Sequence, residues 1–327
     1  MSGGEAQLPR RHARAELRLG IALVLAVSLA ACGEKGVEES SGAVARGPSP
    51  EARQPKAGGE AATSQAQPGS PAPAASSVPT PTSSPPAGAR GASGARRPAW
   101  LGTRVLPPGL DGFGRVQPTP AVLRDRRLAT VDVLPRPRHS AFKATISAVP
   151  PAVAARSTWS PDCPVALEEL AYVRLPFWGF DGQAHTGELL VHADAADDLV
   201  SVLRRLYRQR FPIEEMRVVA PAELDAPPTG DGNNTTAFVC RPTRGSSTWS
   251  QHAYGLAVDV NPFHNPYVRD ELVLPELASA YIDRERARPG MIQPGDAVTR
   301  AFDRIGWEWG GRWERPRDWM HFSSSGR

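Results

Sequence analysis

Two short segments carry the residue types that a metal-dependent hydrolase needs. The first is residues 250–259 (SQHAYGLAVD), and the second is residues 318–321 (DWMH). His252, Asp259 and His321 would supply two nitrogens and one oxygen and leave a fourth position open, the arrangement expected of catalytic rather than structural zinc. The two segments therefore predict a metal centre that binds one zinc ion.

The residues next to the first segment indicate how its carboxylate is held. Residues 256–261 alternate apolar with small or polar side chains. This period of two predicts a strand that buries one face and turns Asp259 to the other. Gly255 and Ala257 are small, and we expect them to leave room beside the carboxylate for a ligand.

The second segment offers a candidate general base. Asp318 and His321 are three residues apart, so a helical or turn-like backbone would place them on one side. A zinc hydrolase needs a base, and no other acid has this spacing. The alternative is that the Asp318 carboxylate only orients the imidazole of His321.

Other histidines lack such acids at fixed offsets. His185 and His192 flank a predicted strand, and we expect both to be solvated rather than to bind a ligand. His264 follows the first segment and could line a cleft, although the prolines of its loop argue against metal ligation.

Composition divides the chain unevenly. The 327 residues include 34 Pro and 30 Gly, many of them early, so the folded part must be shorter than the chain. The formal charge of +4 comes from arginines scattered among acids, which predicts no nucleic-acid partner. A basic surface would still favour an anionic polymer such as a cell wall.

Residues 1–32 have the pattern of a lipoprotein export signal. A basic start precedes an apolar stretch at 19–31, which is shorter than the roughly 20 residues that span a bilayer. Residues 29–33 (LAACG) resemble a bacterial lipobox, which implies lipidation of Cys32. We expect a protein anchored in the bacterial cell envelope on the periplasmic side. The outer membrane is an option, because Cys32 is followed by Gly33 and not by the Asp that the resemblance links to retention in the inner membrane. The alternative is an ordinary cleaved signal with an incidental cysteine.

The remainder divides into a linker and one domain. Residues 33–98 are rich in Ala, Gly, Pro and Ser and predict a disordered tether, whereas 99–327 can form one large domain. Strands are expected at 165–175, 187–192 and 216–219. Helices are expected from a cap at Asp194 to Arg210 and from Asp296 to Ile305. Because strands and helices do not alternate regularly, the pattern favours an α+β fold.

The spacing of His252, Gly255 and Asp259, followed by Asp318 and His321, resembles the zinc D-alanyl-D-alanine peptidases. This family includes VanX-type dipeptidases, VanY-type carboxypeptidases and phage L-alanyl-D-glutamate endolysins. The VanY/endolysin branch is the most similar, on further matched segments at 186–189 (TGEL), 211–213 (FPI), 234–241 (NTTAFVCR), 249–255 (WSQHAYG) and 261–262 (NP). The resemblance covers about 99–327 and implies a Hedgehog/D-Ala-D-Ala peptidase-like fold, with a small antiparallel sheet and flanking helices.

The resemblance also implies residue roles. It makes Arg241 the electrophile that stabilises the carbonyl oxyanion, with a surface arginine as the alternative. Ser250 would hydrogen-bond the substrate, or it would cap a turn. It assigns the base to Asp318 and the zinc ligands to His252, Asp259 and His321.

Two further features bear on the domain. An exported protein retains disulfides, so we predict a Cys163–Cys240 bridge, with two separate buried thiols as the alternative. Aromatic residues gather around a Gly pair at 310–311, where they would either wall a cleft or pack a core. They are Trp307, Trp309, Trp313 and Trp319.

Together these features predict a monomeric zinc peptidase that removes D-alanine from peptidoglycan stem peptides. Cleavage of the L-alanyl-D-glutamate bond is one alternative, because specificity lies in loops rather than in ligands. The other is a non-catalytic, zinc-containing lipoprotein that binds the cell wall.

Overall fold

The computed structural model describes residues 94–109 and 112–327, all of which belong to one compact unit, 81–327. The predicted export signal, the lipidation site Cys32 and nearly all of the predicted linker lie outside the described residues. Within the described part, none of the helices combines the length and apolar character that crossing a membrane would require.

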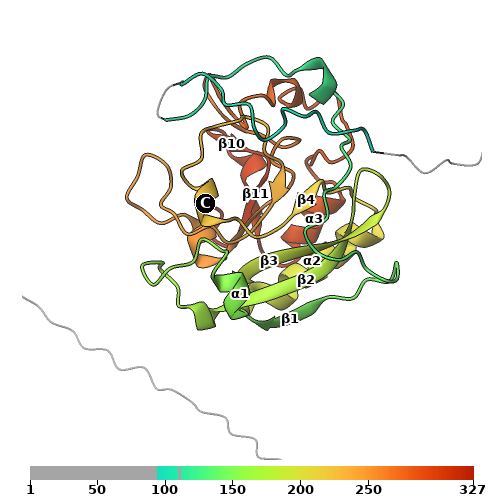
Figure 1. Ribbon diagram of the computed structural model, residues 1–327, viewed down its shortest axis with the longest axis vertical. Coiled ribbons are helices and arrows are strands. Elements are labelled where there is room, and N and C mark those ends of the chain that lie inside the picture. Colours follow the sequence, from blue (N-terminus) through green and yellow to red (C-terminus); the bar gives the residue numbers. More distant parts are fainter. Residues whose placement is uncertain (1–93, 110–111) are drawn as a thin grey trace, which may run out of the picture. The chain divides into compact units, whose positions relative to one another are not determined.

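The largest sheet is an antiparallel meander of three strands in the order β1-β2-β3 (Figure 1). Its strands are β1 (Thr145–Ala148), β2 (Leu170–Trp178) and β3 (Ala184–His192). Helix α2 (Ala196–Arg208) packs against this sheet, with which it shares the main hydrophobic core. The apolar residues that repeat at helical spacing all point inward as predicted: Leu199, Val202, Leu203, Leu206 and Tyr207.

The predicted starts of the two longer helices differ in outcome. A turn of 3-10 helix, η3 (Ala193–Ala195), precedes α2, and the N–H of Asp194 donates to Nδ1 of His192 at 3.3 Å. The prediction that Asp194 caps α2 is therefore wrong. Helix α3 (Ala297–Asp303) begins as predicted, because the Asp296 carboxylate accepts two backbone N–H groups at 2.8 Å.

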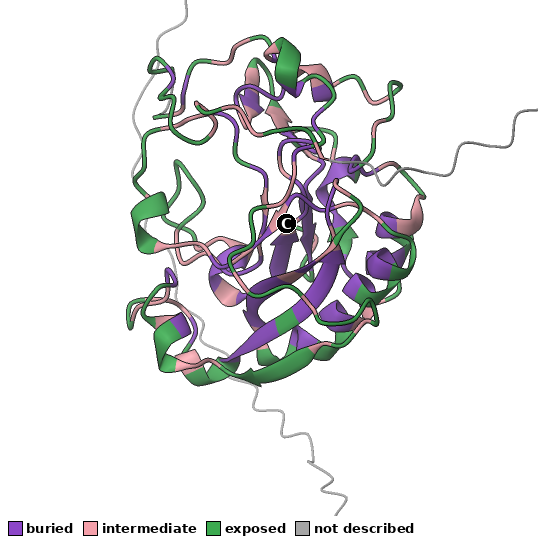
Figure 2. Ribbon diagram, turned by 45° about the vertical axis from the view of Figure 1, so that its right-hand side comes forward, coloured by how far each residue is buried: buried purple, intermediate pink, exposed green. Residues whose placement is uncertain are grey.

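A second antiparallel sheet lies beside the first and has the order β6-β11-β9. Its strands are β6 (Ala257–Asp259), β11 (His321–Ser323) and β9 (Glu308–Trp309). Figure 2 shows that most of β2, β3, β6 and β11 and the inward faces of the helices are buried, whereas β1 is exposed. The two sheets therefore share one core, which holds β6 and β11 rigidly.

Smaller elements complete the domain. A third antiparallel sheet has the order β10-β7-β8, with β10 (Arg317–Asp318), β7 (Tyr267–Arg269) and β8 (Leu272–Leu274). A parallel pair joins β4 (Glu215–Met216) and β5 (Asn234–Thr235). The short helices are η1 (Ala121–Leu123), α1 (Pro151–Ala154), η2 (Leu167–Glu169), η4 (Pro221–Glu223), η5 (Gln251–Tyr254), η6 (Ser279–Tyr281) and η7 (Gly310–Arg312). The result is a mixed α and β fold with small antiparallel sheets and few helices.

A buried polar network ties the N-terminal segment to this core. The carboxylate of Glu214 has no solvent exposure and accepts two hydrogen bonds from Arg126, at 2.7 and 2.8 Å. Arg97 and Asn233 also donate to Glu214, at 3.0 and 2.7 Å. Burial alone would raise the pKa of Glu214, but the charge and hydrogen bonds of Arg126, together with the charge of Arg97, outweigh burial and lower it. Breaking one partner would leave a buried charge, so the network fixes this segment in place.

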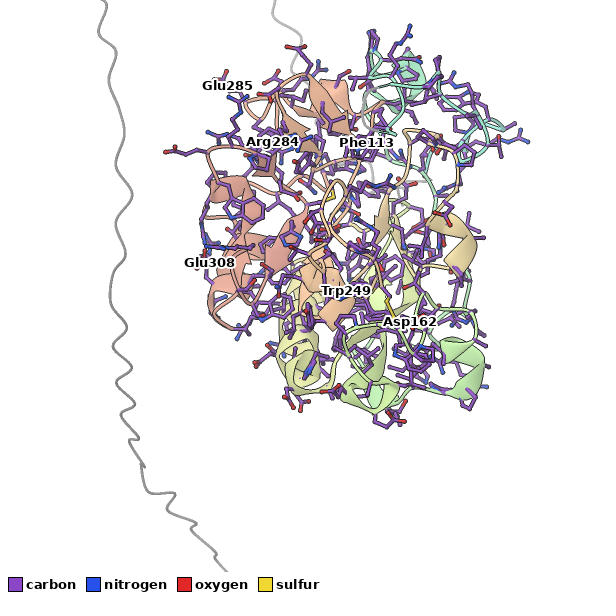
Figure 3. All side chains as sticks on the ribbon, turned by 90° about the vertical axis from the view of Figure 1, so that its left-hand side faces the viewer. Phe113, Asp162, Trp249, Arg284, Glu285 and Glu308 are labelled. Carbon is purple, nitrogen blue, oxygen red and sulfur yellow. A yellow bond between two sulfur atoms is a disulfide. The ribbon has the colours of Figure 1, made fainter. Side chains whose placement is uncertain are left out.

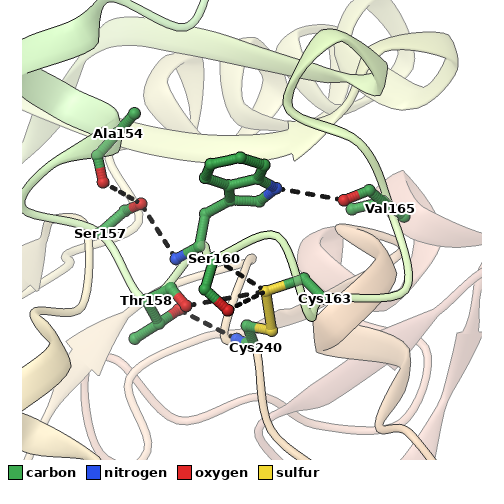
Figure 4. Close-up of a disulfide and its surroundings, with 8 residues drawn as sticks. Ala154, Ser157, Thr158, Ser160, Cys163, Val165 and Cys240 are labelled. Atoms are coloured by element: carbon green, nitrogen blue, oxygen red, sulfur yellow. Dashed lines mark hydrogen bonds between the residues drawn. A yellow bond between two sulfur atoms is a disulfide. The ribbon is translucent and has the colours of Figure 1, made fainter.

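A disulfide joins Cys163 to Cys240 (Figure 4). The N–H of Cys240 also donates to Oγ1 of Thr158 at 2.9 Å. Just before Cys240, the N–H of Val239 donates to the carbonyl of His252 at 3.1 Å. The bridge therefore braces the segment against which the first histidine of the candidate centre rests.

Candidate metal centre

His252 is positioned by a short 3-10 turn, η5. The hydroxyl of Ser250 accepts the N–H of His252 at 3.3 Å and so begins the turn. Gly255 ends it with a left-handed φ of +67°, and a Cβ there would lie 2.4 Å from the backbone nitrogen of His192. Gly255 is therefore required by backbone geometry and a close approach to β3, and not by room for a ligand as we expected.

Asp259 and His321 are brought together by strand pairing. They are direct partners in the antiparallel register of β6 and β11, so their side chains leave the same face of the sheet. The main-chain oxygen of Arg327 accepts from Nε2 of His321 at 3.1 Å and from the hydroxyl of Ser323 at 2.8 Å. This contact fixes the orientation of the His321 ring.

The side chains of His252, Asp259 and His321 converge on one point. Nε2 of His252 lies 3.3 Å from Oδ1 of Asp259 and 3.2 Å from Nδ1 of His321, and the last two atoms are 3.2 Å apart. Tetrahedral zinc with ligand distances of about 2.0–2.1 Å holds its ligand atoms about 3.3 Å apart. Within the described residues, these three form the one group of at least three His, Cys, Asp or Glu side chains spaced for a metal.

The proton positions of the two rings favour a cation at that point. Nδ1 of His252 lies 2.6 Å from the carbonyl oxygen of Ala237, and Nε2 of His321 faces the oxygen of Arg327. A carbonyl oxygen only accepts, so the outer nitrogen of each ring must carry its proton. In the neutral rings, the two inner nitrogens therefore present lone pairs beside the Asp259 carboxylate. Three converging acceptors repel one another unless a positive charge lies between them.

The pKa shifts have the same origin. Burial alone would lower the pKa of His321, but the hydrogen bond and charge of Asp259 outweigh burial and raise it to about 9. Burial would raise the pKa of Asp259, but the charge and hydrogen bond of His252 and those of His321 hold it well below its usual range. Without a metal the centre therefore retains a proton, whose place a divalent cation can take.

Asp318 lies beside this centre at the end of β10. Its Oδ1 is buried and has no hydrogen-bond partner. Burial raises its pKa to about 7, with a further contribution from the Asp259 charge, although the charge of His321 opposes the shift. The backbone of Asp318 approaches Gly310 so closely that a Cβ on residue 310 would lie 2.8 Å from the carbonyl oxygen of Asp318. The glycine therefore allows Asp318 to take its position. A carboxyl group that titrates near neutral pH beside a candidate metal centre is suited to general base and acid catalysis.

Arg241 and Ser250, to which the resemblance assigns contacts with a substrate, make the following contacts within the chain. Burial lowers the pKa of the Arg241 guanidinium, as does the charge of Arg244, whereas the charge of Asp259 raises it. The Arg241 guanidinium donates a hydrogen bond to the carbonyl of Pro242 at 3.2 Å. The Ser250 hydroxyl caps the turn before His252, which is the alternative that the sequence left open.

Three of the four tryptophans lie in the core. Trp307, Trp309 and Trp319 belong to the main hydrophobic core, which was one of the two expectations. Trp313 is partly exposed, and its ring centroid lies 5.7 Å from that of His321. Of the four, Trp313 is therefore the one beside the candidate metal centre.

The two histidines that flank the predicted strand differ in burial. The side chain of His185 is fully buried between Oδ1 of Asp132 at 2.7 Å and Oδ1 of Asp181 at 3.1 Å, so the prediction that it is solvated is wrong. Asp181 lies four residues before His185, whereas Asp132 lies 53 residues before it. His192 is partly exposed, and its ring meets the start of η3.

His264 is also buried and does not join the metal ligands. Its ring stacks on Phe180, and its Nε2 donates to the carbonyl of Arg126 at 2.9 Å. Arg284, labelled in Figure 3, donates to the carbonyl of His264 and stacks over Trp319. Burial lowers the pKa of Arg284 to about 10. Arg284 therefore joins the loop of His264 to the segment 318–321, which contains Asp318 and His321.

Sequence reasoning missed the groups that orient the two imidazoles and the glycine that makes room for Asp318. The carbonyl of Ala237, the oxygen of Arg327 and the close approach of Gly310 act through the backbone. Residue types do not report backbone hydrogen bonds, so no signal in the sequence marks the first two. The Gly pair at 310–311 was visible in the sequence, and it bears only on the close approach of Gly310 to Asp318.

A sheet-borne His-Asp-His centre with a buried carboxylic acid beside it defines a candidate metallohydrolase. Comparison with protein families finds that the model for D-alanyl-D-alanine carboxypeptidase matches residues 244–324, about a quarter of the chain. The matched segment includes His252, Asp259, Asp318 and His321. The match supports a peptidase of the VanY-like family at a coarse level. Comparisons with curated proteins and with solved structures found no match.

Proposed function

We propose that this chain is a zinc peptidase that removes the terminal D-alanine from peptidoglycan stem peptides. One observation carries the proposal: the three acceptor atoms of His252, Asp259 and His321 lie 3.2–3.3 Å apart with both outer imidazole nitrogens held by main-chain oxygens. Their donor set fits Zn²⁺, and the family match to D-alanyl-D-alanine carboxypeptidase spans all three residues.

The residues beside the centre would divide the proton chemistry of peptide hydrolysis. A bound zinc ion supplies Lewis-acid polarisation of a carbonyl and lowers the pKa of water toward neutrality. Asp318 would accept the proton of the attacking water and then deliver it to the leaving amine, for which a pKa of about 7 is suited. Arg241 would stabilise the negative charge that develops on the carbonyl oxygen of the substrate. Trp313, which lies beside the centre, would contact the substrate.

The N-terminal sequence supports a proposal for where in the cell this activity takes place. Because residues 29–33 resemble a lipobox, we propose that Cys32 is lipidated and that residues 33–98 tether the domain to a membrane of the cell envelope. At about 3 Å per extended residue, such a tether would let the domain reach the cell wall.

The direct test is cleavage of defined muropeptides by the purified chain. We expect release of D-alanine from a pentapeptide stem, loss of activity with a chelator and recovery on adding zinc. The variant Asp318→Asn should retain zinc and lose cleavage, whereas the exposed loop carboxylate Asp225 offers a matched control, Asp225→Asn, that should retain both.

Two outcomes would replace the proposal. Release of the stem peptide at L-alanine, with terminal D-alanine left in place, would assign the L-alanyl-D-glutamate endopeptidase activity instead. Zinc binding without cleavage of either bond would indicate a non-catalytic protein that binds the cell wall.

A further inference from the structure

A pocket with a different chemistry opens at the C-terminal end of α2. Its volume is about 380 Å³, within the range of roughly 300–1,000 Å³ typical of small-molecule sites. None of its lining residues belongs to the metal centre. They are Phe142, Trp178, Arg204, Tyr207, Arg208 and Arg210.

Aromatic contacts build the wall of this pocket. The rings of Trp178 and Tyr207 stack at 5.2 Å, and the ring of Phe142 lies 5.5 Å from Tyr207. Hydrogen bonds fix two of the rings: the Trp178 indole donates to the Tyr207 carbonyl at 3.0 Å, and the Tyr207 hydroxyl donates to the Ser140 carbonyl at 2.7 Å. The wall therefore combines a segment before β1, the end of β2 and α2.

Two arginines are held against this wall. The guanidinium of Arg210 lies 4.4 Å from the centroid of Trp178, and that of Arg204 lies 5.2 Å from the centroid of Phe142. Stacking on an aromatic face leaves the N–H groups at the guanidinium edge available to an acceptor. Both side chains are thus partly ordered before a ligand arrives.

The pocket contains an excess of positive charge. Arg204, Arg208 and Arg210 form no ion pair with any carboxylate in the part of the chain that the structure describes, unlike Arg312, which binds Asp303 at 2.7 Å. The helix macrodipole accounts for a basic residue in the last turn of α2, such as Arg208. It does not account for Arg204 and Arg210, which stack on rings instead.

We propose that this pocket binds an acidic sugar unit of an anionic glycan. A carboxylate or phosphate would accept charge-assisted hydrogen bonds from the guanidinium groups, while the sugar ring packs on the exposed parts of Phe142 and Trp178. An anionic lipid surface fits less well, because none of the large exposed apolar residues lines the pocket. The proposal is independent of the peptidase activity, since it uses none of the metal-centre residues.

The test measures binding of a galacturonate oligomer to the purified full chain by calorimetry at low salt. We expect the double variant Arg204→Glu/Arg208→Glu to bind about tenfold or more weakly, and wild-type affinity to fall with added salt. Arg205→Glu/Arg304→Glu makes the same change in charge at exposed positions outside the pocket and should bind within about twofold of wild type.

Binding measurements with further ligands show which kind of molecule supplies the anion. Glucose 6-phosphate should bind at the same pocket, whereas glucose and inorganic phosphate alone should bind at least about tenfold more weakly. Equal loss of binding in both double variants would overturn the proposal, as would binding to phosphatidylglycerol vesicles without binding to the acidic sugars. Cleavage of a small soluble peptide should be equal in both variants, which keeps this test separate from that of the peptidase.

Discussion

Replacing Asp318 by asparagine should reduce catalysis and at the same time make the metal-free fold more stable. Asparagine retains the shape of the side chain but cannot accept a proton at neutral pH. A positioned general base contributes about 10²- to 10⁴-fold to a rate, so kcat should fall by that factor while zinc remains bound.

The stability gain follows from the environment of the same carboxylate. Its Oδ1 is buried without a partner, and an uncompensated negative charge there costs at least about 1–3 kcal/mol, which the neutral amide of asparagine avoids. Because the folded-state pKa of about 7 lies above the reference value of 3.8, the wild type loses stability as pH rises from about 4 through about 7. The metal-free variant should therefore exceed the wild type by about 1–3 kcal/mol at pH 8, and the difference should vanish near pH 4.

Three measurements on Asp318→Asn test this reasoning: kcat, zinc content, and chemical unfolding with a chelator at several pH values. The exposed control Asp225→Asn should change none of them. Retention of more than about one-tenth of kcat would refute the role as base. A metal-free variant less stable than the wild type at pH 8 would refute the account of the unpartnered oxygen.

Further predictions concern pH, geometry and the disulfide. Since His321 in the metal-free centre has a pKa of about 9, zinc must displace its proton, and apparent zinc affinity should rise about tenfold per pH unit from 7 to 9 and then level off, as measured by competition with a chelating dye. Gly310→Ala would press on the backbone of the proposed base, so kcat should fall about tenfold or more with zinc retained, whereas Gly232→Ala, which meets no atom within 4 Å, should leave kcat unchanged. Replacing Cys163 and Cys240 by serine should lower the free energy of unfolding by about 2–5 kcal/mol in denaturant titrations, because the bridge closes a loop with a sequence separation of 77; an unchanged midpoint would contradict this.

The pH dependence of the peptidase reaction should also follow the proposed base. Only the carboxylate form of Asp318 accepts a proton, so kcat should fall as pH decreases through its pKa. A nearby cation favours the carboxylate, which places this limb of the profile at or below about 7 in the zinc-loaded enzyme. In Asp318→Glu the limb should persist at a shifted pH, whereas in Asp318→Asn it should disappear.

Local patterns in the sequence predicted the elements that carry the site. The helical repeat of Leu199, Leu203 and Leu206 identified α2, because one apolar face must be buried whatever covers it. The second helix was predicted to start at Asp296 and starts at Ala297, because the Asp296 carboxylate accepts the free backbone N–H groups of its first turn. The order and spacing of two motifs selected His252 and His321. The register of β6 and β11 explains why Asp259 and His321, 62 positions apart, meet.

Features that depend on distant partners were not predictable in this way. His185 reads as a surface residue beside a strand, yet Asp132, 53 positions away, makes its burial possible. Glu214 is buried because Arg126 arrives from 88 positions earlier in the chain. Such pairs leave no periodic signal, because each member is polar and its partner lies far away in the sequence. Tertiary packing, rather than local propensity, decides where they lie.

The metal content of the purified chain, with the identity of its ligands, tests the account most directly. X-ray absorption at the zinc edge should find one zinc ion per chain with two imidazole nitrogens and oxygen ligands at about 2.0–2.2 Å. In His252→Ala and in His321→Ala, zinc should be lost while the fold remains. A chain that purifies without zinc and does not bind it when titrated, or a zinc ion that remains after both histidines are replaced, would contradict the account.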